Sequence, residues 1–259
     1  TFYPHPSKVL GLSEGAPLLT SLEHRLRLFD ELGVDCALVL RFTRTLSSMK
    51  AADFINNVLG RIRIYEIIQG SNFFFGKDKS GTLRDLEKFS HSYGYHLTVV
   101  KTFNSSGKII SSTWIRNLIM KGELKKASFL LSRSVTILGT VKPGSKRGRL
   151  LGYPTANIDP HHEAIPPSGV YASKVRVGNR IYKGVLNIGT RPTFKKDSLS
   201  ECESTVEVHI FNFKRSIYGK DVEISFAKRI RREKKFKSRA SLIRQIRLDE
   251  KKAKKILAE

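Results

Sequence analysis

Apolar residues recur at helical spacing in the first half of the chain, and short apolar runs separate the helical stretches. Leu22, Leu26 and Phe29 share one face of a helix that is predicted to begin at the capping-box pattern Thr20-Ser21-Leu22-Glu23. The run Cys36–Leu40 has the length and continuous apolar character of a buried parallel strand. Further helices are predicted over 53–59, 82–94 and 112–120, and further strands over 62–68 and 95–100. This alternation predicts an α/β domain with a mostly parallel sheet.

The second half of the chain changes to a period of two. Val206 and Val208 alternate with Glu207, and Val222, Ile224 and Phe226 form a similar series. Gly178-Asn179 between two such segments is typical of a two-residue hairpin, so we expect an antiparallel barrel or sandwich. The chain then ends in a long helix that either Ser238 or Ser241 caps. Its apolar stripe is expected to dock on the barrel and consists of Leu242, Ile246, Ala253 and Ile256 or Leu257. The change of period predicts two domains, 1–131 and 132–259.

The chain is strongly basic. It has 47 Lys and Arg against 23 Asp and Glu, a formal net charge of +24. Residues 131–259 hold 29 of these cations and 12 of the acids, so the excess lies mainly in the second half. Such a charge favours anionic partners, either nucleic acid or the phosphates of a nucleotide.

Hydropathy and cysteine usage favour a cytoplasmic protein. No apolar run approaches the ~20 residues of a membrane span, and the first residues lack a signal-peptide pattern. Cys36 and Cys202 are the only cysteines and belong to no metal-binding cluster. We therefore expect a reducing compartment, no membrane association and no structural zinc. The sequence leaves the oligomeric state open.

Residues 144–157 carry the strongest candidate for chemistry. Three glycines and three cations precede Thr155 and Asn157, which face the same way on an extended segment. Glycine-rich backbone with cations forms anion sites, and a hydroxyl with an amide oxygen suits Mg²⁺ beside phosphates. The spacing differs from that of a Walker A loop. The alternative is a basic, glycine-rich surface turn that leads into an edge strand.

The motif Gly148-Arg149-x-x-Gly152-x-Pro154-Thr155-Ala156-Asn157 resembles the ATP-binding signature of riboflavin kinases. The similarity continues in order through three further blocks: Pro167-Ser168-Gly169-Val170-Tyr171, Gly184 to Phe194, and Val206-Glu207-Val208-His209-Ile210 with Tyr218-Gly219-Lys220. These blocks span roughly half of the chain. The resemblance implies an antiparallel β-barrel kinase domain with a C-terminal helix.

The resemblance also implies roles for individual residues. Glu207 corresponds to the proposed base that activates the ribityl 5′-hydroxyl of riboflavin, and its place opposite the apolar face fits a carboxylate that faces a cleft. Thr155 and Asn157 are assigned to Mg²⁺ and the ATP phosphates, and Gly148, Arg149 and Gly152 to the loop over them. Weaker flavin candidates are Arg191 and Phe236. The alternatives are a solvated strand glutamate at 207, a solvated arginine at 191 and a helix-start contact for Phe236. A packed or surface role is expected for His209.

Three blocks of the first half resemble the FMN adenylyltransferase domain of bacterial bifunctional FAD synthetases, a Rossmann-like nucleotidyltransferase. They are Phe2-x-Pro4-His5-Pro6, Gly70-Ser71-Asn72-Phe73-Phe74-Phe75-Gly76-Lys77 and Ser111-Ser112-Thr113-Trp114-Ile115-Arg116. By this resemblance Ser112, Thr113 and Arg116 bind ATP phosphates at a helix start, and Asn72 lies near the flavin. The family's HxGH motif precedes the first block and is not in the chain as given. Adenylylation is therefore expected of the complete protein.

The predicted function is phosphorylation of riboflavin to FMN with ATP and Mg²⁺, and adenylylation of FMN to FAD by the complete protein. One alternative is a riboflavin kinase whose first half is an inactive scaffold. The other is a basic RNA-binding protein, against which no recognised RNA-binding signature is found. The expected partners are small molecules, namely riboflavin, FMN and ATP, with neither nucleic acid nor membrane.

Overall fold

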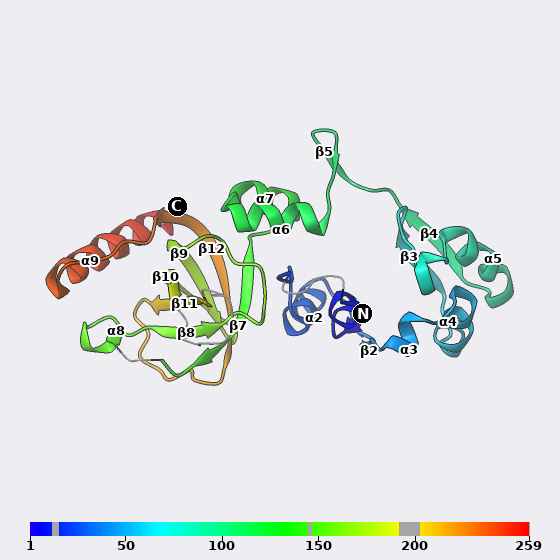
Figure 1. Ribbon diagram of the computed structural model, residues 1–259, viewed down its shortest axis with the longest axis horizontal. Helices are drawn as coiled ribbons and strands as arrows, with labels where there is room; N and C mark the ends of the chain where they lie inside the picture. The colour runs from blue at the N-terminus through cyan, green and yellow to red at the C-terminus, as the bar shows by residue number, and fades with distance from the viewer. Residues whose placement is uncertain (12–15, 145–146, 192–202, 259) are drawn as a thin grey trace. The chain divides into compact units, whose positions relative to one another are not determined.

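The computed structural model describes residues 1–11, 16–144, 147–191 and 203–258 (Figure 1). The chain divides into two compact units. The first unit comprises Thr1–Ala16 and Val34–Ile110, and the second comprises Pro17–Gly33 and Ser111–Glu259. The domain boundary at residue 131 stays a prediction.

The first unit contains the predicted parallel α/β structure. Strand β3 (Glu66–Gly70) pairs in parallel with β4 (His96–Val100), and helix α5 (Leu83–Tyr93) connects them. Thr82 begins α5 as predicted: its backbone N–H and its hydroxyl both donate to Asp85 Oδ2, at 2.8 and 2.7 Å. These bonds lower the pKa of Asp85. The remaining elements are β1 (Phe2–Tyr3), α1 (Pro6–Leu10), β2 (Leu40–Arg41), α3 (Arg44–Ser47), α4 (Ala51–Asn57), η1 (Leu59–Arg61), η2 (Lys77–Lys79), β5 (Asn104–Ser105) and β6 (Lys108–Ile109).

The predicted buried strand over 36–40 is wrong for most of its length. Strand β2 begins only at Leu40 and pairs in parallel with the two-residue β1, while Leu38 is 50% exposed. Thr1 bonds to this run through its backbone: its amino group donates to Leu38 O at 2.7 Å and its carbonyl accepts from Leu40 N at 2.8 Å. The strand predicted over 62–68 also begins late, at Glu66, and follows the short helix η1 (Leu59–Arg61).

The second unit is built on a closed antiparallel barrel, as the period of two predicts. Its strands are β7 (Thr136–Lys142), β8 (Ala156–Asp159), β9 (Gly169–Val177), β10 (Arg180–Arg191), β11 (Glu203–Ile210) and β12 (Asp221–Arg231). They follow one another around the barrel in the order β10-β11-β8-β7-β12-β9, and β9 pairs with β10 to close it. The alternating apolar residues fill the interior: Ile137, Val175, Leu186, Val208 and Ile224 are fully buried.

The C-terminal helix α9 (Arg239–Ile256) docks on the barrel, which confirms the prediction for the second half of its apolar stripe (Figure 1). Ser238 is the N-cap, and its hydroxyl accepts from Ser241 N at 3.2 Å. Ala253 and Leu257 pack into one buried cluster with Ala172 and Phe211 of the barrel. The other helices of this unit are α2 (Leu22–Glu31), α6 (Ser112–Lys121), α7 (Leu124–Leu131) and α8 (Arg147–Leu150). No helix within the described ranges is both long and apolar enough to cross a membrane.

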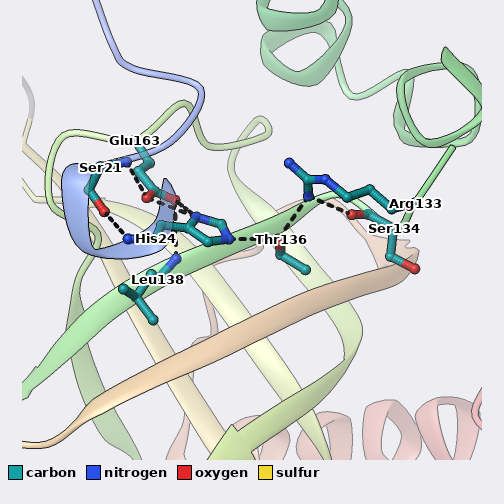
Figure 2. Close-up of polar contacts among 7 residues, drawn as sticks. All are labelled: Ser21, His24, Arg133, Ser134, Thr136, Leu138 and Glu163. Atoms are coloured by element: carbon teal, nitrogen blue, oxygen red, sulfur yellow. Dashed lines mark hydrogen bonds and ion pairs between the residues drawn. The ribbon is translucent and has the colours of Figure 1, made fainter. Parts of the chain in front are cut away.

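A buried polar cluster joins α2 to the barrel (Figure 2). Ser21, and not Thr20 of the predicted capping box, is the N-cap of α2, and its hydroxyl accepts from His24 N at 3.2 Å. His24 Nδ1 lies 2.9 Å from both carboxylate oxygens of Glu163, and both side chains are fully buried. The same carboxylate accepts from Ser21 N at 2.7 Å and from Leu138 N at 3.1 Å.

The far side of the His24 ring extends the cluster. His24 Nε2 lies 3.0 Å from Thr136 Oγ1 of β7, and Arg133 Nη1 donates to the same hydroxyl oxygen at 3.2 Å. Figure 2 shows these side chains in one line beside β7. The carboxylate of Glu163 therefore links the start of α2 to β7, because its two oxygens accept hydrogen bonds from N–H groups of both elements.

We predict that Glu163→Ala strongly destabilises the second unit. The substitution leaves His24 and two backbone N–H groups buried without their acceptor, and loss of one partner of a buried pair costs about 3–5 kcal/mol. Urea unfolding followed by the fluorescence of Trp114, which lies in this unit, measures the loss. Glu250→Gln is the control, since its i,i+4 helix pair with the exposed Lys254 contributes about 0.3–0.5 kcal/mol. A loss for Glu163→Ala as small as that of the control would contradict the role given to the cluster.

Candidate active site

Three polar residues lie in one row across neighbouring strands of the barrel. In the antiparallel ladders, Glu207 of β11 pairs with Asn157 of β8 on one side and with Asn187 of β10 on the other. Directly paired residues of adjacent strands present their side chains on the same face of the sheet. Val206 and Val208, on either side of Glu207, are 2% and 0% exposed and face the core. Glu207 therefore faces away from the core, as the alternation predicts.

A cavity of about 320 Å³ lies over this face. Its polar lining includes Thr155, Asn187, Glu207, His209, Arg231 and Asp249. Its apolar lining includes Leu151, Val170, Val185, Phe236, Leu242 and Ile246. The last two belong to the first half of the α9 stripe, so this helix docks on the barrel with one end and lines the cavity with the other. The cavity thus has a polar side and an apolar side.

The glycine-rich segment packs closely on the two predicted magnesium ligands. A Cβ on Gly144 would lie 1.9 Å from Asn157 Nδ2, and a Cβ on Gly148 would lie 2.4 Å from Tyr153 O and 3.0 Å from Thr155 Oγ1. Only glycine permits such an approach. Gly152 adopts a left-handed conformation with φ +83°, and its N–H donates to Arg149 O at 3.1 Å.

The structure brings Gly148, Thr155, Glu207 and Phe236 to the same cavity. Asn157 is not part of its lining but is paired with Glu207 in the adjacent strand. Arg149 is exposed. Arg191 ends β10, and its side chain lies outside the described residues, as do Ser145 and Lys146 of the glycine segment and the block over 192–194.

A buried ion pair positions the aromatic side of the cavity. Arg231 Nε and Nη2 lie 2.9 and 2.8 Å from Asp249 Oδ2, and Asp249 is 2% exposed. Gln245 Nε2 donates to Asp249 Oδ1 at 2.9 Å. The Arg231 guanidinium also lies 5.6 Å from the ring centre of Phe236, within cation–π range. The pair therefore ties α9 to β12 beside the ring.

Sequence reasoning missed Asn187, Arg231 and Asp249 as site residues. The alternation of apolar and polar residues could have identified Asn187. Leu186 and Ile188 on either side of it are core residues, so Asn187 faces the other way, toward the cavity. The contact between Arg231 and Asp249 had no local signal in the sequence, since it joins a strand to a helix position 18 residues later.

One acidic group beside the row is held ionised. Burial raises the pKa of the Asp159 carboxyl, but hydrogen bonds from Lys142 and His161 outweigh burial and hold its pKa below the ordinary value. Lys142 Nζ lies 2.5 Å from Asp159 Oδ2. Across the described ranges, no group of three or more His, Cys, Asp and Glu side chains is arranged to hold a metal.

The residues predicted for adenylylation fall in both units. Ser111 caps α6 by accepting from Trp114 N at 3.3 Å, and Ser112 and Thr113 are exposed in its first turn. Arg116 Nε donates to Pro17 O at 2.7 Å. Asn72 is exposed in the turn after β3 of the first unit.

Two families match the chain in sequence. The riboflavin kinase family matches residues 131–257, and the FAD synthetase family matches residues 1–114. The bifunctional riboflavin kinase/FMN adenylyltransferase of Bacillus subtilis is 35% identical over 256 residues, which cover 98% of this chain and 80% of that protein. The protein of the same name from Listeria monocytogenes is 38% identical over 252 residues, or 96% of this chain and 79% of that protein.

A solved structure supports the fold over nearly the whole chain. A crystal structure described as a macrolide-efflux protein from Streptococcus pneumoniae superposes with a TM-score of 0.81 and 30% sequence identity, and the match covers 98% of this chain and 82% of that one. The two family matches and the two relatives confirm the expected resemblance. The chain belongs to the family of bifunctional riboflavin kinases/FMN adenylyltransferases.

Proposed function

We propose that the barrel unit transfers the γ-phosphoryl group of ATP to the ribityl 5′-hydroxyl of riboflavin, with Glu207 as the general base. The observation that carries the proposal is the shared cavity of Glu207, Thr155 and Phe236. The hydroxyl oxygen attacks the γ-phosphorus as the bond from that phosphorus to ADP breaks. The hydroxyl proton passes to the Glu207 carboxylate, and the products are FMN and ADP.

The polar and apolar sides of the cavity indicate how the two substrates would lie in it. A flavin ring system is flat and has an apolar dimethylbenzene end, and Phe236, Leu242 and Ile246 offer it a matching surface. The phosphates belong at the other side, where Gly148 approaches Thr155. The ribityl chain would then extend from the aromatic side toward Glu207.

Thr155 and Asn157 are the proposed ligands for the Mg²⁺ that accompanies ATP. Their hydroxyl and amide oxygens are hard neutral donors, and the approach of Gly144 and Gly148 encloses both side chains. When bound, Mg²⁺ neutralises the charge on the transferred phosphate. The side chains hold the nucleotide in place while Glu207 accepts the proton.

The second proposed activity is adenylylation of FMN by ATP, which yields FAD and pyrophosphate. The match of residues 1–114 to the FAD synthetase family supports it. Ser112 and Thr113 stand at the positive end of α6, which favours a phosphate. We assign Arg116 to the same phosphates and Asn72 to the flavin. Chromatographic separation of FMN from FAD after incubation with riboflavin and Mg-ATP distinguishes this activity from a kinase with an inactive first half.

Riboflavin, FMN and ATP are therefore the proposed small-molecule partners, and the proposed location is the cytoplasm. Cys36 is free and exposed, which supports a reducing compartment. Cys202 lies outside the described residues.

Glu207→Gln is expected to lower kcat for FMN formation by about 10²–10⁴-fold, the usual contribution of a general base. The amide keeps the size of the side chain but cannot accept the proton. Thermal unfolding should be unchanged, because Glu207 lies outside the core. Glu87→Gln, at an exposed helix position in the first unit, serves as the control and should keep full activity. Normal turnover by Glu207→Gln would rule out the assignment.

Gly148→Ala is expected to raise KM for ATP by at least about tenfold, because a displacement of about 1 Å at a substrate subsite is costly. Its Cβ would collide with Tyr153 O and push the loop off Thr155. Gly178→Asn is the matched control: Gly178 has φ +56°, has no atom within 4 Å of an added Cβ, and lies in a hairpin turn where asparagine is tolerated. Equal KM values for both variants would show that the close approach at Gly148 has no role in nucleotide binding.

A further inference from the structure

The side chain of His209 is bonded to the peptide that leads into Thr155. His209 Nδ1 lies 2.8 Å from Pro154 O. A carbonyl oxygen only accepts, so Nδ1 carries the proton and donates it. The peptide unit between Pro154 and Thr155 is planar, so a hydrogen bond to its oxygen also orients the backbone N and Cα of Thr155.

This bond continues the β8–β11 ladder beyond its last backbone pair. The ladder pairs Glu207 with Asn157 and Val208 with Ala156, and it ends there. The next position of the same register sets His209 opposite Thr155. Pro154, one residue earlier, has no N–H with which to extend the ladder. The imidazole supplies a side-chain bond at the point where the backbone bonds stop.

Aromatic neighbours hold the imidazole in this orientation. The rings of Tyr153 and Phe211 meet it edge to face, with centroid distances of 5.4 and 5.8 Å. Tyr153 is itself tied to the glycine segment, because its N–H donates to Gly148 O at 2.9 Å. A continuous series of contacts thus runs from His209 through residues 153 and 154 to Gly148, which packs on Thr155.

We propose that His209 is a positioning residue for the nucleotide subsite: it holds the Tyr153-Pro154 segment so that Gly148 and Thr155 stay in register with Glu207. This inference deepens the proposed kinase function and rests on it. His209 acts through Pro154 and does not take part in the transfer of the proton or the phosphoryl group. Its role differs from the packed or surface role that the sequence suggested.

Three substitutions separate the hydrogen bond from the bulk of the ring. Asparagine has an amide N–H close to the position of His209 Nδ1, and glutamine has one close to the position of His209 Nε2. Alanine has no side-chain donor. His209→Ala and His209→Gln should weaken Mg-ADP binding by about tenfold, the loss of one good hydrogen bond, whereas His209→Asn should stay within about threefold of the original chain. Isothermal titration with Mg-ADP measures this without any turnover.

Steady-state kinetics supply the second readout. The Ala and Gln variants should raise KM for ATP with little change in kcat or in KM for riboflavin, because they remove ground-state binding of the nucleotide. His96→Ala, an exposed histidine of the first unit with a similar edge-on aromatic contact to Tyr65, is the control and should change neither value.

The outcomes are distinct. Rescue by asparagine alone supports the positioning role. Equal weakening in all three variants would overturn it in favour of simple ring packing, and original affinity in all three would overturn it as well. Failure of the original chain to phosphorylate riboflavin would remove the proposed function, whereas the Mg-ADP titration would still report whether His209 positions a nucleotide subsite.

Discussion

The antiparallel register of β8, β11 and β10 is the constraint on which the candidate site depends. It aligns Asn157, Glu207 and Asn187 in one row and turns Val206 and Val208 into the core. A shift of the pairing by one residue would bury the carboxylate and expose the valines, so packing of the core enforces the register. The burial of its two neighbours thereby sets the face of the sheet on which Glu207 lies.

Other parts of the second unit build the walls around this row. The glycine segment approaches Thr155 and Asn157 from one side because it lacks side chains at the points of contact. The first half of helix α9 forms the opposite wall. The last turns of the helix pack on the barrel, and the Arg231–Asp249 pair anchors its middle. The His24–Glu163 cluster performs a similar task away from the cavity, since it fastens α2 to β7 with bonds that water cannot reach.

Local patterns in the sequence predict much of this arrangement. Alternation from Val206 to Ile210 gives the face of Glu207, and the glycine spacing locates the loop that covers Thr155. Patterns of this kind carry no information on which strands are neighbours, so the pairing of Glu207 with Asn187 emerges only from the folded barrel. The contact of His24 with Glu163 spans 139 residues of sequence and is hidden for the same reason. The apolar run over 36–40 misled the prediction because hydrophobicity alone does not determine which residues join a ladder; of this run only Leu40 lies in a strand, where it pairs with Phe2.

We propose that one cavity brings the flavin hydroxyl to Glu207 while Thr155 and Asn157 hold the nucleotide, and a crystal structure of the chain with riboflavin and Mg-ADP would show whether it does. We expect the flavin ring against Phe236, the 5′-oxygen within about 3.2 Å of the Glu207 carboxylate, and the ADP phosphates beside Thr155. A flavin bound elsewhere on the barrel, or a 5′-oxygen turned away from Glu207 with ADP in place, would rule out this arrangement.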